Sequence, residues 1–311
     1  MRIFDARSVR EKLSYQRIAP SIRDAMIALS SGDARQLLRS FIPIGPRHIF
    51  ALMPAANLKT GYFGAKLLSV FPDALGEVQH SGFVVLFEQA SGEPVCLADA
   101  EEVTRVRTAV ASAVATEALA RPEASILAVL GTGKQAAAHI EAIAGMRQLA
   151  KVHVWGRDAA KAASLAARMV KLCNVPVEAS RTVPEAVKDA DIICTVTGAP
   201  EPVLEGKWVK PGAHVNVVGS STPGPVEVDE DLVVNSRFIV DHREHVLAHG
   251  AEFLRAKMAG AITDDHIVAE IGEVLAGLKP GRTEARQITV YKSLGHAVQD
   301  IAAATWLYEH A

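Results

Sequence analysis

The stretch SILAVLGTGKQAAA, residues 125–138, decides the fold. Ile126–Leu130 is an uncharged aliphatic run, long enough for one strand buried on both faces and too short for a helix with a core of its own. Gly131 and Gly133 follow at once, and an alanine-rich segment with helical character continues from Ala136. The order strand, Gly-x-Gly-x-x-Ala, helix is typical of a turn that receives a pyrophosphate, because backbone amides and the positive end of the helix dipole face the phosphates.

A second predicted strand, Lys151–Trp155, comes about twenty residues further on, where such a fold meets the adenosine ribose. An NAD site usually has an acid there, whereas this chain has Arg157, with Lys161 one turn later. An Arg can pair with a 2′-phosphate, so we expect NADP(H), with NAD(H) possible. Asp158 is either a cofactor contact or the cap of the next helix.

Two further buried strands are predicted in this half of the chain, at Asp191–Val196 and His214–Val218. Each ends in small or hydroxyl residues, Thr195 and Thr197 after the first and Gly219-Ser220 after the second. In a parallel sheet the ligand binds outside the carboxyl ends of the strands. We therefore expect these residues to contact the cofactor.

The N-terminal half has a different pattern. Two amphipathic helices, broken around Pro20, are followed by short β-leaning segments with Gly and Pro between them, which indicates an antiparallel sheet. A long helix, Glu101–Ala120, leads into the Gly-rich half. The expected fold is therefore α/β, with a Rossmann-type doubly wound sheet and an α+β lobe for substrate binding and dimerisation.

Bulk properties exclude several functions. With 311 residues and a formal net charge of -2, the chain offers no basic field for nucleic acid or a membrane surface. Cys96, Cys173 and Cys194 are odd in number and widely spaced, which indicates reduced thiols. The charged N-terminus lacks the apolar core of a signal peptide, so we expect a cytoplasmic protein.

Three histidines with helical spacing require a check for metal binding. His242, His245 and His249 lie in a highly charged segment of the nucleotide-binding half. Such a helix is usually solvated, and we therefore predict no metal site.

Three cations stand within or beside apolar segments of the first lobe. They are Arg39 in LLRSFIP, Lys66 in GAKLLSVFP, and Arg107 before TAVASAVATEALA. Taken singly, each is as readily a solvated side chain as a functional one. Together they could hold a carboxylate, since Arg offers a bidentate fork and Lys a compact charge. His80 is a weaker candidate for the same region.

Spaced motifs make nearly the whole chain resemble the ornithine cyclodeaminase/μ-crystallin family. The matching landmarks are LMPA (52–55), GAKLLSVFP (64–72), RTAVASAVAT (107–116), LGTGKQA (130–136), VWGR (154–157), EPVLEGKWVKPGAHVNVVGSS (201–221) and ITVYKSLGHAVQD (288–300). The resemblance implies a Rossmann domain over residues 119–287. It also implies a substrate-binding and dimerisation lobe over residues 1–118, completed by 288–311, and a homodimer.

The resemblance also implies roles for individual residues. Arg39, Lys66 and Arg107 match the positions that hold the substrate carboxylate, and Lys66 and Ser221 are the candidate catalytic residues. The expected cofactor contacts are His80, Arg107, Thr108, Gly131, Thr132, Gly133, Gln135, Arg157, Asp158, Lys161, Thr195, Thr197, Val218, Gly219, Ser220 and Ser293.

Two departures from the family pattern help to choose a reaction. Cyclodeaminases of the family carry a carboxylate where this chain has Ala51, and an Asp where it has Ser221. Losing both removes a cation site and a general base, which a deaminating cyclisation needs. The resemblance therefore implies an NAD(P)H-dependent reductase of cyclic imino acids, converting Δ1-pyrroline-2-carboxylate to L-proline and, as a further substrate, Δ1-piperideine-2-carboxylate to L-pipecolate.

Three alternatives stay open at this point. They are an NAD-dependent ornithine cyclodeaminase, an amino-acid dehydrogenase, and an NADPH-dependent binding protein without turnover. The proton donor is also open between Lys66, a water near Ser221, and the more remote Asp300.

Overall fold

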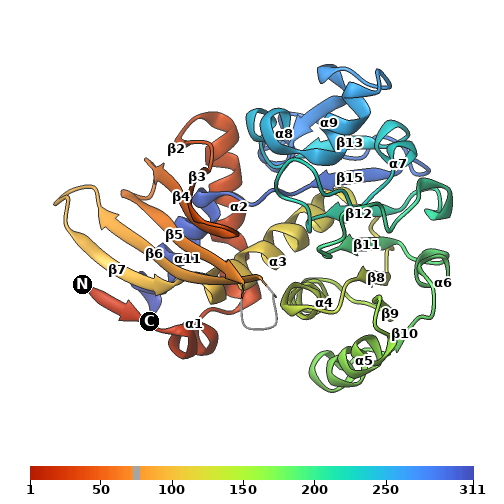
Figure 1. Ribbon diagram of the computed structural model, residues 1–311, viewed down its shortest axis with the longest axis horizontal. Helices are drawn as coiled ribbons and strands as arrows, with labels where there is room; N and C mark the ends of the chain where they lie inside the picture. Colours follow the sequence, from red (N-terminus) through yellow and green to blue (C-terminus); the bar gives the residue numbers. More distant parts are fainter. Residues whose placement is uncertain (73–77) are drawn as a thin grey trace. The chain divides into compact units, whose positions relative to one another are not determined.

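The computed structural model describes residues 1–72 and 78–311, and the chain divides into two compact units (Figure 1). Unit 1 comprises Met1–Ala111 and His296–Ala311, and unit 2 comprises Ser112–Gly295. The predicted boundary at residue 288 falls before the strand β15 (Thr289–Lys292). That strand pairs with β12 (His214–Val217), so it belongs to the sheet of unit 2 and not to the first lobe.

Unit 1 contains a seven-stranded sheet in the order β1-β7-β6-β5-β4-β2, with β3 also paired to β4. The strands are β1 (Arg2–Phe4), β2 (Ala34–Gln36), β3 (Ser40–Gly45), β4 (His48–Asn57), β5 (Tyr62–Pro72), β6 (Val78–Glu88) and β7 (Pro94–Asp99). All pairings are antiparallel, as predicted, except that β1 runs parallel to β7. The sequence pattern does not single out β1, β2 and β7, since short strands show little periodicity.

Two prolines that were expected to separate strands lie inside them. Pro43 lies in β3, which pairs only with β4. Pro54 lies in β4 where one side of the strand has no paired neighbour. On that side β2 pairs with β4 as far as Ala55, and the pairing with β3 begins at Leu52. A missing N–H on that side costs no ladder bond, so the strand continues through the proline.

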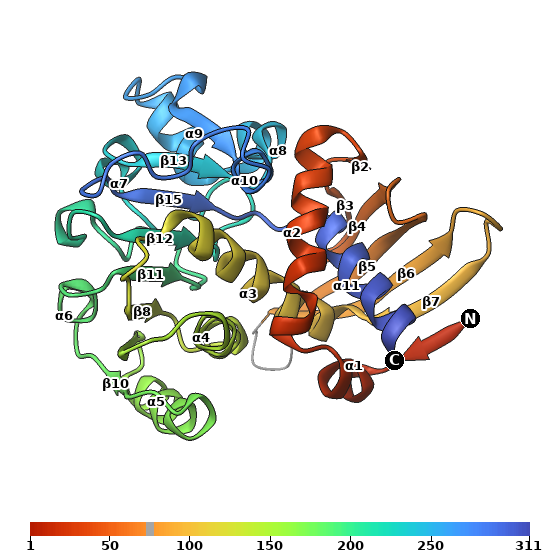
Figure 2. The same ribbon diagram turned by 180° about the vertical axis from the view of Figure 1, so that it is seen from behind.

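The predicted helix break at Pro20 is wrong. The first helix, α1 (Ala6–Lys12), ends before Ser14, whose hydroxyl accepts from the Arg17 N–H and caps α2 (Tyr15–Ser31). Pro20 lies inside α2 on its exposed side. There the carbonyl that loses its partner can turn to water, so the helix continues. The C-terminal helix α11 (Ala297–His310) packs beside α2 and against β4, β5 and β6 (Figure 2).

Unit 2 contains an eight-stranded sheet in the order β10-β9-β8-β11-β12-β15-β13-β14, and every pairing is parallel. Its remaining strands are β8 (Ile126–Leu130), β9 (Lys151–Trp155), β10 (Val177–Ala179), β11 (Ile192–Thr195), β13 (Arg237–Val240) and β14 (Ile267–Glu270). β13 is not the edge of this sheet, because β14 pairs beyond it and β15 inserts between it and β12. The doubly wound fold class is confirmed.

The helices of unit 2 follow its strands. They are α4 (Lys134–Met146), α5 (Ala159–Cys173), α6 (Val183–Val187), α7 (Glu230–Val234), α8 (Arg243–His249), α9 (Ala251–Met258) and α10 (Ile271–Leu275), while α3 (Ala100–Leu119) begins in unit 1 and ends in unit 2. The core of unit 2 consists of aliphatic side chains from β8, β11, β12, β13 and β15 with Phe238 and Phe253. Strands buried on both faces account for the uncharged runs seen in the sequence.

Candidate functional site

Unit 1 buries an ion cluster, here called the Lys66 cluster, made of Lys66, Arg107 and Asp300. Lys66 comes from β5, Arg107 from α3 and Asp300 from α11, and they are 2%, 4% and 0% exposed. Lys66 Nζ lies 3.2 Å from Asp300 Oδ1 and 3.1 Å from Oδ2, and Arg107 Nε lies 2.9 Å from Oδ1. Two of the three cations predicted to hold a carboxylate therefore share one buried acid.

Neighbouring groups hold this cluster in place. Arg107 Nη1 donates to Gln299 Oε1 at 2.8 Å, and Gln299 Nε2 in turn donates to the sulfur of Met26. Lys66 Nζ also donates to Thr104 Oγ1 at 3.2 Å. In the described chain Arg107 Nη2 donates to no acceptor, which leaves part of the guanidinium fork available to a ligand.

The electrostatics of the cluster show a surplus of positive charge. Burial lowers the pKa of Lys66 to about 8, Asp300 opposes that fall, and Arg107 and Arg39 add to it. Arg39 lies in the loop between β2 and β3, half-buried, and so stands near enough to act on Lys66. Within the cluster two cations, Lys66 and Arg107, share one carboxylate, and a second carboxylate would neutralise the excess.

The glycine turn of unit 2 has the shape expected of a phosphate site. Gly131 has φ 137°, and a Cβ there would stand 2.6 Å from the Val196 carbonyl oxygen, so only glycine fits. Gly133 starts α4 without a side-chain cap from any described residue, and a Cβ on it would meet open space. A pyrophosphate can therefore approach the first turn of α4.

The end of β9 places three predicted cofactor residues at the surface. Arg157, Asp158 and Lys161 are exposed. The Asp158 carboxylate caps α5, accepting from Ala160 N at 2.9 Å and from Lys161 N at 3.1 Å. Among the residues described, no acid pairs with Arg157. Its guanidinium thus remains available to an anion.

Glu227 joins the two loops that follow β11 and β12. Its Oε1 accepts from Thr197 N at 2.6 Å and Thr197 Oγ1 at 2.9 Å, and its Oε2 accepts from Thr195 Oγ1 at 2.8 Å and Gly219 N at 2.5 Å. A Cβ at Gly219 would stand 2.1 Å from the Thr197 carbonyl oxygen, so this close approach requires glycine. Three predicted cofactor contacts are thus fixed by one buried acid.

Lys292 and Glu252 extend this arrangement. Lys292 Nζ lies 2.7 Å from Glu252 Oε2, and it donates to the Ser220 carbonyl at 2.7 Å and to Ser220 Oγ at 2.6 Å. Ser220 Oγ donates to Glu252 Oε1, which also accepts from Glu227 N at 3.1 Å. We call Lys292, Glu252, Ser220 and Glu227 the Lys292 network.

The remaining predicted residues divide between the units. Val218 and Ser293 lie at the carboxyl ends of β12 and β15, and the buried Ser293 hydroxyl has no hydrogen-bond partner in the described chain. Thr132 and Gln135 lie in the glycine turn and the first turn of α4, and Ser221 is half-buried after β12. His80, Arg107 and Thr108 belong to unit 1, where His80 is exposed on β6 and Thr108 is buried in α3. An orphaned buried hydroxyl and an open glycine turn fit a dinucleotide.

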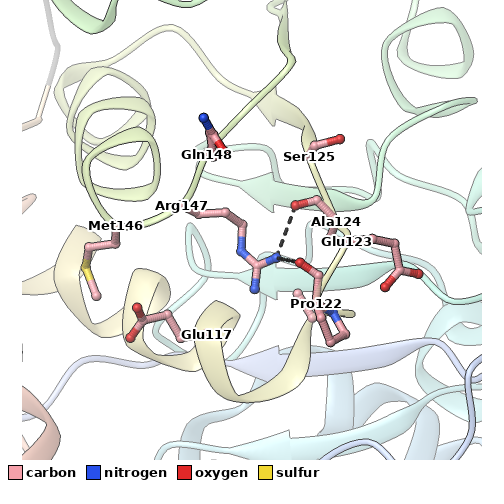
Figure 3. Close-up of a pocket in the computed structure, with 9 residues that line it drawn as sticks. Glu117, Pro122, Glu123, Ala124, Ser125, Met146, Arg147 and Gln148 are labelled. Carbon is pink, nitrogen blue, oxygen red and sulfur yellow. Dashed lines mark hydrogen bonds between the residues drawn. The ribbon is translucent and has the colours of Figure 1, made fainter.

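A cavity of about 600 Å³ lies at the amino end of β8, at the opposite end of this strand from Gly131 (Figure 3). Arg147 reaches into it and donates to the carbonyls of Pro122 and Ala124, so its guanidinium is engaged by the loop after α3. None of the predicted site residues lines it.

Two further observations concern metal ligands and membrane spans. No group of three metal-ligating side chains occurs among residues 1–72 and 78–311, where His245 is buried and His242 precedes α8. In the same residues, no helix has both the length and the apolarity needed to cross a membrane.

The sequence pattern did not single out the acids that organise both clusters. From the sequence Asp300 is only a remote candidate for the proton donor, and the pattern indicates none of Glu227, Glu252 and Lys292. A charged residue at the end of an apolar strand, as in ITVYKS, is a signal that would have indicated Lys292. Glu227 and Glu252 lie in ordinary polar surroundings in the sequence and carry no such signal.

Comparisons with known proteins agree with this geometry. A family model described as "Ornithine cyclodeaminase/mu-crystallin family" matches residues 2–311. The ketimine reductase mu-crystallin of Mus musculus is 35% identical over 314 residues, spanning 98% of this chain and 95% of its own. The Delta(1)-pyrroline-2-carboxylate reductase of Bacillus cereus is 32% identical over 311 residues, spanning 98% and 95%. The solved structure of Thermococcus litoralis Delta(1)-pyrroline-2-carboxylate reductase with NADH and L-proline has a TM-score of 0.94 and 29% identity, spanning 99% of this chain and 97% of that one.

Proposed function

This chain belongs to the ornithine cyclodeaminase/mu-crystallin family, and from that premise we propose that it reduces cyclic imino acids with NAD(P)H. The substrate is Δ1-pyrroline-2-carboxylate, reduced to L-proline, and the six-membered Δ1-piperideine-2-carboxylate is a second substrate. Relatives named for ketimine and Δ1-pyrroline-2-carboxylate reduction support this assignment. The observation that carries it is the surplus positive charge of the Lys66 cluster.

The substrate carboxylate takes the place of a missing second anion in that cluster. Arg107 binds it through the part of its fork that Asp300 and Gln299 do not use, and Lys66 and Arg39 add charge. Burial strengthens these charge-assisted hydrogen bonds, because little water competes for them. The carboxylate thereby fixes the orientation of the adjacent C2 atom, which is a gain in positioning.

Imine reduction adds a hydride at C2 and a proton at the ring nitrogen. The bound reduced nicotinamide supplies the hydride. We assign the proton to Lys66, whose lowered pKa of about 8 makes proton release easier near neutral pH. Asp300 lies between two cations and serves as their counterion.

The site lacks groups that ornithine cyclisation needs. Ala51 is buried in β4 between Phe41 and Leu68 of the neighbouring strands, so no carboxylate stands there for a distal ammonium. Ser221 provides no carboxylate base after β12. This argument favours reduction over deaminating cyclisation.

For the cofactor we propose NADP(H) over NAD(H). Arg157 is exposed at the end of β9 and Lys161 follows on α5, while the Asp158 carboxylate is engaged in capping that helix. Arg157→Asp should raise the KM for NADPH by roughly tenfold or more and affect NADH much less, because it replaces a partner of the 2′-phosphate with a repelling charge. Arg168→Asp, on the exposed side of the same helix, is the matched control. Equal losses with both cofactors would contradict the assignment.

We also propose a homodimer in the cytoplasm. Phe41, Ile42 and Ile44 on β3 are 43%, 49% and 57% exposed, an apolar group that a second copy of unit 1 would cover. Cys96 and Cys194 are buried free thiols, as expected in a reducing compartment. Sedimentation should give about twice the chain mass of 33.1 kDa, and a monomer at micromolar concentration would contradict the dimer.

The decisive test measures oxidation of NADPH and NADH with five- and six-membered cyclic imino acids. We expect imine-dependent loss of the reduced-nicotinamide absorbance and formation of L-proline or L-pipecolate. Incubation with ornithine and no added electron acceptor is the counter-test. Ammonia and proline formed there, without imine reduction, would identify a cyclodeaminase instead.

A further inference from the structure

The Lys292 network buries more acid than base at the carboxyl edge of the sheet in unit 2. Glu227, Glu252 and Lys292 are 0%, 2% and 0% exposed, so two carboxylates share one ammonium. Lys292 is fully engaged with Glu252 and both oxygens of Ser220. Glu227 is therefore balanced only by neutral donors and by Lys292 at longer range.

The hydrogen bonds around Glu227 fit its charged form. Each of its oxygens accepts one backbone N–H, from Thr197 or Gly219, and one threonine hydroxyl. Burial raises the pKa of this carboxyl above its usual range, although these donors and Lys292 oppose that rise. For Glu252 the balance falls the other way, and Lys292 and Ser220 hold its pKa below the usual range despite burial. With Glu227 in the charged form that its four donors fit, the network carries one surplus negative charge.

The strand order indicates which end of a dinucleotide this charge faces. The order reverses between β8 and β11, and a dinucleotide lies across such a switch point. The turn at Gly131 after β8 takes the pyrophosphate, and the end of β9 meets the adenosine ribose. The nicotinamide half then lies toward β11 and β12, whose following loops Glu227 holds together.

We propose that the surplus negative charge of the Lys292 network tunes the redox balance of the bound cofactor, favouring its oxidised ring over its reduced ring. This inference rests on the proposed function. The oxidised nicotinamide ring carries a positive charge and the reduced ring is neutral, so a nearby carboxylate attracts only the former. Hydride donation by a bound reduced nicotinamide would create that positive charge, while the ring nitrogen of the substrate would take a proton. The network therefore makes the reduced cofactor a stronger hydride donor.

The test compares the Kd values of NADP⁺ and NADPH for the full-length protein, measured by calorimetric titration without imine. Glu227→Gln and Glu252→Gln each remove one negative charge with little change of shape. We expect each to raise the ratio Kd(NADP⁺)/Kd(NADPH) by roughly four- to fifteenfold, the range for unit charges about 10 Å apart at an effective dielectric constant of roughly 20 to 40. Glu178→Gln, on the exposed edge strand β10, is the matched control and should leave the ratio unchanged.

The outcomes separate this inference from the proposed function. Loosening of the loops weakens both cofactor forms alike, so a ratio unchanged in both variants would overturn the inference. If the wild-type protein bound neither dinucleotide, the proposed NAD(P)H-dependent reduction would itself be contradicted. Circular dichroism checks folding, and if Glu227→Gln does not fold, Glu252→Gln decides the question alone.

Discussion

Two buried ion clusters, one in each unit, differ in the sign of their surplus charge. The Lys66 cluster sets Lys66 and Arg107 against the single carboxylate of Asp300. The Lys292 network sets Glu227 and Glu252 against a single lysine. Burying unbalanced charge is costly, so each surplus indicates a charged ligand or a fixed field.

The clusters also differ in how completely their polar atoms are used. In the Lys66 cluster, Arg107 Nη2 has no acceptor among the residues described, which suits a site that receives an anion. In the Lys292 network, the ammonium, the Ser220 hydroxyl and both oxygens of Glu227 are engaged, and several partners are backbone groups. The first arrangement leaves a donor for a ligand, while the second holds together the loops that follow β11 and β12.

The largest expected effect on activity comes from substituting Arg107 in the Lys66 cluster, whose Nη2 has no acceptor among the described residues. Arg107→Met should lower kcat/KM for the cyclic imine by roughly 100- to 1,000-fold, because it removes a buried partner of the substrate carboxylate and leaves Asp300 less well paired. Arg105→Met is the matched control on the same helix, since Arg105 pairs with Glu102 outside the cluster. Steady-state kinetics with a thermal melt would measure both. A folded Arg107 variant within tenfold of wild type would place the carboxylate elsewhere.

An intermediate effect is expected from substituting Asp300, the acid that Lys66 and Arg107 share. Asp300 raises the pKa of Lys66, so Asp300→Asn should lower that pKa further below about 8. Lys66 then loses its proton at lower pH, and the alkaline limb of the kcat/KM profile should move down by about one pH unit. Asp24→Asn, an exposed change on α2, is the control. An unmoved limb would show that Lys66 is not the group that titrates.

The smallest effect is expected in the Lys292 network. Ser220→Ala removes one hydroxyl, but the loop backbone stays bound through the Gly219 N–H and the Ser220 carbonyl. We expect a loss of about 1–3 kcal/mol in the free energy of unfolding, and a fall in kcat/KM of less than about tenfold. Urea titration and kinetics would test this pair of values. A kinetic loss as large as that of Arg107→Met would mean that Ser220 acts directly on the reaction.

Local sequence predicted the strands that carry the cofactor turn. β8 and β9 begin and end at the predicted residues, because buried parallel strands are apolar runs bounded by turn residues. The family resemblance is confirmed, since its spaced motifs cover nearly the whole chain. The NADP(H) preference and the roles of the individual site residues stay predictions.

Other features depended on residues far apart in the sequence. β15 inserts between β12 and β13 although β13 precedes it in the chain by about fifty residues, a pairing that no local period encodes. Pro20 and Pro54 interrupt neither α2 nor β4, since exposure or a gap in the ladder removes the cost of the missing N–H.

Sequence alone was enough to predict the glycine turn, the fold class and the family, because these follow from spacing between near neighbours and from the order of several motifs. Only the tertiary structure decided which charges meet. Asp300 lies 234 residues from Lys66 and 193 from Arg107, yet one carboxylate contacts both. The energy of a buried charge depends on what lies within a few ångströms of it, and chain order does not specify that distance.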